Sequence, residues 1–175
     1  GYVGLPLALA FSKEISTTGF DVDPSRVDEL RTGVDRNNEL SSSELTSSKL
    51  SFTKESSCIS DAEFIVVTVP TPITDRYEPD LSMLKSASEL IGNRLRKRGK
   101  NLSPAIVVFE STTYPGCTEG FCGPLIEKAS GLKSGVDFFL GYSPERTNFG
   151  DDIHTLETVV KVVSGLTPEV AELVS

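Results

Sequence analysis

The sequence predicts an α/β protein of the Rossmann-like, doubly wound class, with a mostly parallel sheet. Apolar runs alternate between strand and helix character along the whole chain, and polar, proline-containing turns follow three successive apolar runs. The chain also opens on half of a glycine-rich turn, with neither a methionine nor a strand before Gly1. We therefore expect one nucleotide-binding type of domain over residues 1–175, truncated at both ends.

Each expected element rests on its own pattern. Residues 63–69 are mostly β-branched, which is typical of a strand buried on both faces of a parallel sheet. Apolar side chains at 81, 84, 87, 91 and 95 recur at helical spacing, and Asp80 can cap that helix. Pro24 suits the first turn of another helix. In chain order, the expected elements are a helix over 5–11, a strand over 17–23, a helix over 24–33, a polar loop with a short helix over 34–48, a minor strand over 50–53, a strand over 63–69, a helix over 81–95, a strand over 105–109, a helix over 116–129, a strand over 136–142, a peripheral strand over 159–163 and a helix opening at 167–169.

Composition excludes several classes of function. The 175 residues carry 25 acidic and 17 basic side chains, for a net charge of −8, and phosphate backbones of nucleic acids favour basic surfaces. No apolar run approaches the roughly 18 residues of a membrane span. These two observations predict neither a nucleic-acid partner nor a membrane span. Cys58, Cys117 and Cys122 form neither a metal-binding spacing nor an even disulfide set, so we expect no metal site and a reducing, cytoplasmic setting.

The opening turn is the first candidate binding element. Gly1, Tyr2, Val3 and Gly4 match the second half of a Gly-x-Gly-x-x-Gly turn. In such a turn one glycine lets the backbone approach a pyrophosphate, another lets the helix pack on the sheet, and the helix N-terminus faces the phosphates.

An acidic residue at the end of the second strand is the usual companion of that turn. Asp21 lies 20 residues after Gly1, where a carboxylate can accept hydrogen bonds from ribose hydroxyls. Alternatively, Asp21 and Asp23 could both cap the helix that opens at Pro24, although Asp23 suits that role better. Arg26 could lie near the ribose or face solvent, and the sequence leaves those two readings open.

Polar turns follow three successive predicted strands. They are Thr68-Val69-Pro70-Thr71-Pro72, Glu110-Ser111-Thr112-Thr113-Tyr114-Pro115-Gly116 and Ser143-Pro144-Glu145-Arg146. Ligands of open α/β sheets bind at the carboxyl ends of strands, so the three turns predict one crevice.

Four segments in this order and spacing resemble the UDP-glucose/GDP-mannose dehydrogenase family: GYVGLPLA, TVPTP, ESTTYPGCTE and GYSPER. The likeness covers essentially the whole chain. Glu110, Arg146 and Thr147 stand where UDP-glucose enzymes more often have lysine and Phe-Leu, so the chain is most similar to bacterial UDP-N-acetylhexosamine 6-dehydrogenases.

The resemblance implies the NAD-binding domain of a three-part enzyme. Such an enzyme oxidises the C6 alcohol of a UDP-sugar to a carboxylate with two NAD, through a cysteine thiohemiacetal and thioester, for surface polysaccharide synthesis. It implies a homodimer or higher oligomer formed through a central helical domain that this chain lacks. By motif, the implied cofactor-binding residues are Gly1, Tyr2, Val3, Gly4, Asp21, Arg26, Thr71 and Thr112, the implied catalytic residues are Glu145 and Thr112, and the implied substrate-binding residues are Arg146 and Thr147.

Departures from the family pattern leave other functions open. None of the three cysteines matches the Gly-Gly-x-Cys-x-Pro-Lys-Asp setting of the family nucleophile, so all three are interpreted as structural and the chain alone is expected to be inactive. Alternatives are a UDP-glucose or GDP-mannose 6-dehydrogenase, or a non-catalytic dinucleotide-binding module. Asp21 predicts NAD over NADP. Arg26 could oppose that preference by pairing with a 2′-phosphate, but Asp21 is fixed directly after the strand, whereas Arg26 on the following helix can swing to solvent.

Overall fold

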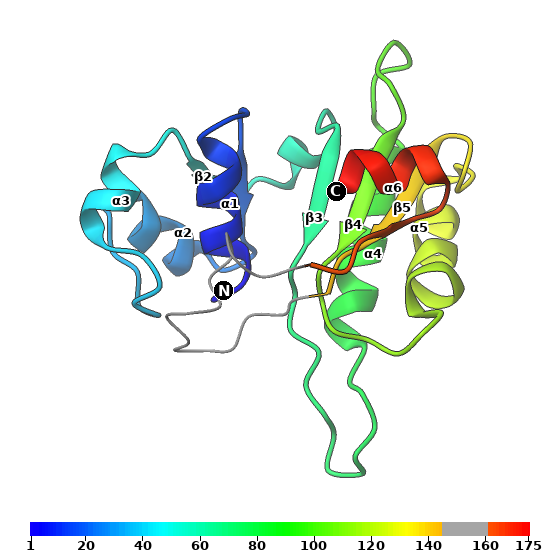
Figure 1. Cartoon of the computed structure of the whole chain (residues 1–175), viewed down its shortest axis with the longest axis horizontal. Helices are drawn as coiled ribbons and strands as arrows, with labels where there is room; N and C mark the ends of the chain where they lie inside the picture. The colour runs from blue at the N-terminus through cyan, green and yellow to red at the C-terminus, as the bar shows by residue number, and fades with distance from the viewer. Residues whose placement is uncertain (145–160) are drawn as a thin grey trace. The chain divides into compact units, whose positions relative to one another are not determined.

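A computed structural model describes residues 1–144 and 161–175 (Figure 1). The chain divides into two compact units, Gly1–Cys58 and Ile59–Ser175. Both units are built from helices and parallel strands, which confirms the α/β class predicted from the alternating apolar runs.

The first unit packs three helices beside a two-stranded sheet. Its elements are α1 (Gly4–Ser12), β1 (Thr18–Phe20), α2 (Pro24–Arg31), α3 (Ser42–Ser47) and β2 (Ser51–Thr53), followed by the 3₁₀ turn η1 (Ser56–Ile59). Strands β1 and β2 run parallel, with Gly19 opposite Phe52. A leucine cluster forms the core and joins the helices to the end of the polar loop; its buried members are Leu5, Leu30, Leu45 and Leu50.

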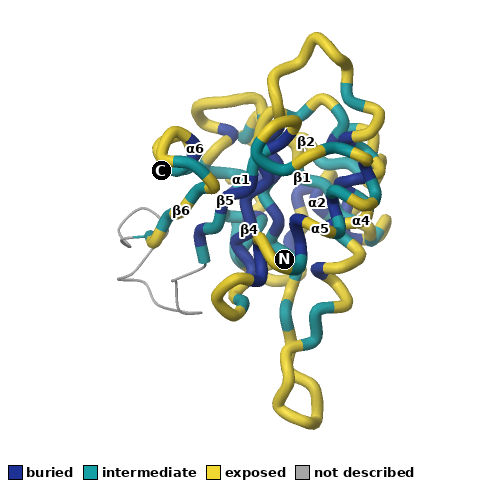
Figure 2. Tube along the Cα trace, turned by 90° about the vertical axis from the view of Figure 1, so that its right-hand side faces the viewer, coloured by how far each residue is buried: buried dark blue, intermediate teal, exposed yellow. Residues whose placement is uncertain are grey.

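The second unit contains the larger sheet, in the order β3-β4-β5-β6. Its elements are β3 (Phe64–Val67), α4 (Ser82–Leu95), β4 (Ala105–Phe109), the π-helical turn η2 (Thr118–Cys122), α5 (Gly123–Ser130), β5 (Phe138–Tyr142), β6 (Ser164–Gly165) and α6 (Pro168–Val174). The first three strands are parallel and β6 is antiparallel to β5. Strand β4 is buried along its whole length (Figure 2).

Helices cover both faces of this sheet, as a doubly wound fold requires. Ile106 and Val108 pack with Val170 of α6 on one face. Because side chains alternate along a strand, the other residues of β4 point to the opposite face, where α4 and α5 pack together. Gly92 permits their close approach, since a Cβ there would lie 2.7 Å from both the Cβ of Ala129 and the carbonyl oxygen of Ile126.

The structure differs from the sequence prediction in three places. The sequence predicted a single sheet, whereas the described strands form two sheets, β1-β2 and β3-β4-β5-β6, and no described strand pairs with both β1 and β3. Of the strand expected over 159–163, residues 159–160 lie outside the described residues and 161–163 are not strand. Strand β6 instead pairs only with Gly141 and Tyr142, since β5 ends there. The helix expected over 116–129 begins as a π-helical turn, and Pro124 has no N–H to continue a regular ladder.

Candidate cofactor-binding site

The opening turn leads directly into α1. The Leu5 N–H donates to the Gly1 carbonyl at 3.2 Å, and the Leu7 N–H donates to the Val3 carbonyl at 3.4 Å. A Cβ built on Gly1 would meet no atom within 4 Å, so space is open beside this turn. The first N–H groups of a helix have no partner within the helix and carry its positive dipole end. The start of α1 can therefore bind an anionic group.

Asp21 lies just past the end of β1, as predicted. Its N–H donates to the Thr53 carbonyl at 3.2 Å, which ties it to the end of the sheet. Its Oδ1 accepts the Asp23 N–H at 2.9 Å, whereas Oδ2 has no hydrogen-bond partner among the residues that the structure describes. Asp23 caps α2 by accepting the Ser25 N–H at 2.9 Å, which confirms the capping role expected of Asp23; the ribose-binding role of Asp21 stays a prediction.

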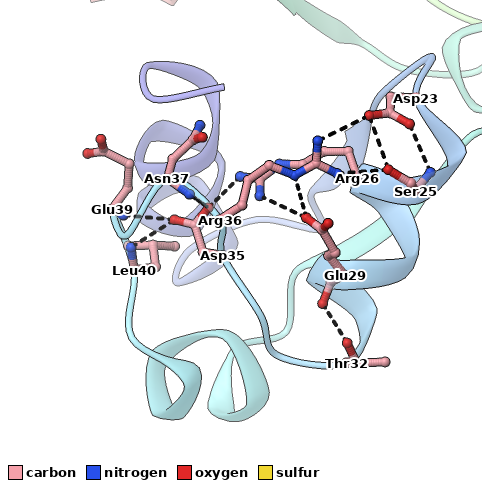
Figure 3. A network of polar contacts seen from close by, with 10 residues as sticks. All are labelled: Asp23, Ser25, Arg26, Glu29, Thr32, Asp35, Arg36, Asn37, Glu39 and Leu40. Atoms are coloured by element: carbon pink, nitrogen blue, oxygen red, sulfur yellow. Dashed lines mark hydrogen bonds and ion pairs between the residues drawn. The ribbon is translucent and has the colours of Figure 1, made fainter.

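Arg26 does not face solvent, which was one of the two readings that the sequence left open. It is only 4% exposed, and its Nη2 donates to Asp35 Oδ1 at 2.5 Å (Figure 3). Its Nη1 has no hydrogen-bond partner in the described part of the chain. The reason is tertiary: Asp35 lies in the loop that folds back over α2 and offers a buried carboxylate nine residues further along the chain.

Charged groups gather around the opening turn. Burial lowers the pKa of the Gly1 amino group, while the nearby carboxylates of Asp21, Asp35 and Glu39 act in the opposite direction and the Arg26 guanidinium adds to the lowering. These groups therefore lie within electrostatic range of the turn that the sequence associates with a pyrophosphate. The first unit thus brings together Gly1, Asp21 and Arg26, although the sequence analysis did not identify Asp35.

In the second unit, the predicted turns that follow β3 and β4 contact each other at the carboxyl edge of the sheet. Thr71 Oγ1 donates to the Thr112 carbonyl at 2.7 Å, and Ser111 Oγ donates to the Val69 carbonyl at 2.5 Å. The Thr113 N–H donates to the hydroxyl of Tyr142 on β5 at 3.4 Å. The first two turns therefore contact each other, and Tyr142 links the third strand to them; a single crevice formed by all three turns stays a prediction.

An ion pair that the sequence analysis missed lies at the same edge. Glu110 directly follows β4 and is 6% exposed, and Lys161 Nζ lies 2.6 Å from its Oε2. The pair spans 51 residues, so no local pattern could have revealed it. Glu145, Arg146 and Thr147, which the sequence singled out in the third turn, lie outside the described residues.

The described cysteines do not form a nucleophilic site. Cys117 and Cys122 are free thiols that are each 1% exposed, and Cys58 is half-buried. Burial is the main cause that raises the pKa of Cys122 to about 12, so its thiol stays protonated at neutral pH. In the described ranges no group of histidine, cysteine, aspartate or glutamate side chains could hold a metal, and no helix is long and apolar enough to cross a membrane.

The first unit fits a dinucleotide on its own chemistry. It offers a helix N-terminus for a phosphate, the Oδ2 acceptor of Asp21 for a hydroxyl and the unsatisfied Nη1 donor of Arg26. A shallow hollow of about 430 Å³ lies at the other end of α1. Its lining includes Lys13, Glu44 and Lys49 but none of the groups named above, so it is not part of this site.

Comparison with known proteins agrees with this chemistry. The family model described as the NAD-binding domain of the UDP-glucose/GDP-mannose dehydrogenase family matches residues 1–175. The chain is 48% identical over 176 residues to Protein CapL of Staphylococcus aureus and 49% identical over 175 residues to UDP-N-acetyl-D-glucosamine 6-dehydrogenase of Pseudomonas aeruginosa. It covers 40% of each relative, while these alignments include 100% and 99% of the chain.

Solved structures show the same fold. A UDP-glucose dehydrogenase from Pyrobaculum islandicum matches with a TM-score of 0.82 at 27% identity, over 99% of this chain and 40% of that one. An NDP-N-acetyl-D-galactosaminuronic acid dehydrogenase from Methanosarcina mazei matches with a TM-score of 0.81 at 28% identity, over 96% of this chain and 38% of the other. NAD is therefore the cofactor that the fold and the family indicate. The chain belongs to the UDP-glucose/GDP-mannose dehydrogenase family and corresponds to its NAD-binding domain.

Proposed function

We propose that the protein carrying this chain is an NAD-dependent UDP-N-acetylhexosamine 6-dehydrogenase, which oxidises the C6 alcohol of the sugar to a carboxylate. The observation that carries this proposal is 49% identity, over 99% of the chain, to a relative named for that activity on UDP-N-acetyl-D-glucosamine. Because the chain spans 40% of that relative, the activity belongs to a longer protein than the residues described above. The name CapL of another relative supports a role in capsular polysaccharide supply.

In the first unit, we assign cofactor binding to the opening turn and to the end of β1. The backbone amides of Gly1 to Gly4, including those of Tyr2 and Val3, would bind the pyrophosphate through the helix N-terminus. Asp21 would accept a hydrogen bond from a ribose hydroxyl through Oδ2, and Arg26 would donate one through Nη1. Bound NAD supplies a hydride acceptor; the residues of this unit bind and orient it.

In the second unit, we assign the turns at the sheet edge to the reacting end of the site. The hydrogen bond from Thr71 to the Thr112 carbonyl supports a common role for both threonines beside the dinucleotide, and Thr112 would also hold a water near the reacting carbon. Glu145 would activate water for thioester hydrolysis, and Arg146 and Thr147 would contact the sugar nucleotide. The nucleophilic cysteine is not assigned to this chain, because Cys117 and Cys122 are buried.

The remaining parts of the proposal follow from the family. A cytoplasmic enzyme acting on a UDP-sugar, as a homodimer or higher oligomer, is the expected form. UDP-glucose is the alternative substrate, since a UDP-glucose dehydrogenase shares the fold with a TM-score of 0.82. A binding module without turnover is the alternative of a different class.

NADH formation tests the proposal directly. The protein at the length of its relatives should reduce NAD with UDP-N-acetylglucosamine or UDP-N-acetylgalactosamine, forming two NADH for each sugar oxidised, and react less well with UDP-glucose. Preference for UDP-glucose would replace the proposed substrate, and NAD binding without turnover on any of the three would indicate the module. The 175-residue chain alone should show no sustained turnover, because none of its cysteines lies in the setting of the family nucleophile and both Cys117 and Cys122 are buried.

A further inference from the structure

We propose that Asp35 sets the preference for NAD over NADP by holding the Arg26 guanidinium in a buried ion pair. The inference rests on the proposed placement of the adenosine ribose at Asp21. It concerns a residue that does not itself contact the cofactor, so Asp35 is a positioning residue. Without it, Arg26 would be a mobile cation beside the position of the 2′ group.

The first step is the geometry of the pair. Arg26 Nη2 lies 2.5 Å from Asp35 Oδ1, and the two side chains are 5% and 0% exposed. Nη1 lies 3.7 Å from Glu29 Oε2 and has no hydrogen-bond partner among the described residues. Arg26 therefore has one unused donor group on Nη1, which suits one ribose oxygen. A guanidinium that binds phosphate strongly instead offers two parallel donors, and here Asp35 already occupies the second nitrogen.

The second step is that Asp35 is held rigidly. Besides Arg26, its Oδ1 accepts the Asn37 N–H at 3.1 Å, and its Oδ2 accepts the N–H groups of Glu39 at 2.8 Å and Leu40 at 3.1 Å (Figure 3). Burial acts to raise the pKa of Asp35, but the bonds from Arg26 and from these backbone groups outweigh it and lower the pKa. Asp35 is thus ionised at neutral pH and compensates the charge of Arg26.

The third step is the surrounding charge. Arg36, the other cation of this network, is itself paired: its Nε lies 2.6 Å from Glu29 Oε2 and its Nη1 lies 3.5 Å from Asp23 Oδ2 (Figure 3). Both guanidinium groups are therefore committed to carboxylates, while Asp21 adds a carboxylate with an available oxygen. A 2′-phosphate carries a charge of about −1.5 to −2, so this environment repels it and accepts a hydroxyl.

Cofactor binding to three variants and to the unmutated protein tests the inference. In the protein at the length of its relatives, calorimetric titration gives the dissociation constants of NAD and NADP. Asp35→Asn should shift the ratio of the two constants towards NADP by about tenfold, since it frees a charged donor for the phosphate. Arg26→Met combined with Asp35→Asn replaces the two opposite charges of the ion pair with two uncharged side chains. The ratio of the two dissociation constants should then stay within about threefold of that of the unmutated protein.

A matched control separates this effect from a general loss of negative charge. Asp28→Asn removes one carboxylate from the exposed face of the same helix, where Asp28 is 70% exposed, and should not shift the ratio. An unchanged ratio in Asp35→Asn, or an equal shift in the double variant, would overturn the inference. Unmutated protein that binds neither cofactor would overturn the proposed NAD site as well, so the two failures are distinguishable.

A second measurement does not depend on the folding of any variant. The Asp35→Asn variant could place an amide N–H against the backbone donors of Glu39 and Leu40 and so lose stability. Circular dichroism must therefore accompany each titration, whereas the following measurement needs no variant. A crystal structure of the unmutated protein with NAD should retain the pair between Arg26 Nη2 and Asp35 Oδ1. If Arg26 turns away from Asp35 when NAD binds, the inference is wrong.

Discussion

Replacing Lys161 by methionine should destabilise the second unit strongly. Lys161 Nζ lies 2.6 Å from Glu110 Oε2, and the two side chains are 18% and 6% exposed. Removing one partner of a buried pair costs about 3–5 kcal/mol, because the other charge stays buried and loses the opposite charge beside it. We expect the lower end, about 3 kcal/mol, since Lys161 keeps some contact with water.

Urea unfolding of the chain followed by circular dichroism measures this loss. With a slope of about 1.5 kcal/mol per molar urea, the midpoint should fall by about 2 M. Lys85→Met is the matched control: it removes the same charge from an exposed position on α4 and should change the free energy of unfolding by no more than about 0.5 kcal/mol. Because the pair is buried, the difference should persist at high salt. If the two variants unfold within about 0.5 kcal/mol of each other, burial of the Glu110 charge is not what gives the pair its importance.

Two further perturbations test packing and thiol burial. Gly92→Ala should lower the free energy of unfolding by about 1–3 kcal/mol in the same urea assay, because its Cβ would lie 2.7 Å from atoms of α5. Gly120→Ala is the control, since a Cβ there meets nothing within 4 Å and should not destabilise the chain by packing. Equal free energies of unfolding for the two variants would contradict the close packing of α4 and α5. In the native chain at about pH 8, a thiol reagent followed by mass spectrometry should modify Cys58 well before Cys117 and Cys122, since reactivity requires an accessible thiolate; equal rates at all three would show that the thiols of Cys117 and Cys122 are not protected.

Elements whose cause is local were predicted closely from the sequence. The strand expected over 105–109 is β4 to the residue, because a short apolar run bounded by polar residues can only be buried on both faces. Asp23 caps α2 as expected, since a cap and Pro24 act within one helical turn. The turns at 68–72 and 110–116 meet because carboxyl ends of neighbouring parallel strands share one edge.

Interactions between distant residues were not predicted. The guanidinium of Arg98, in the basic run that follows α4, donates to the carbonyls of Ser60, Ala62 and Ser103. Arg26 pairs with Asp35 for the same kind of reason: a long side chain finds its acceptor where the chain folds back. Residue spacing does not encode such partners, although a carboxylate shortly after the helix-ending Gly33 was a signal that Asp35 could order a turn.

The charge of the chain explains why these pairs matter for the proposed site. A protein with a net charge of −8 must bind an anionic dinucleotide, yet the arginines of the network beside Asp21 are already paired with carboxylates. In the proposed site, the backbone amides at the start of α1 would attract the pyrophosphate. The first turn of α1 contains no acidic side chain that would offset the positive end of the helix dipole. In the proposed site, side-chain charge is left to discriminate: Asp21 would accept a hydroxyl, and Asp35 would keep Arg26 from recognising a phosphate in its place.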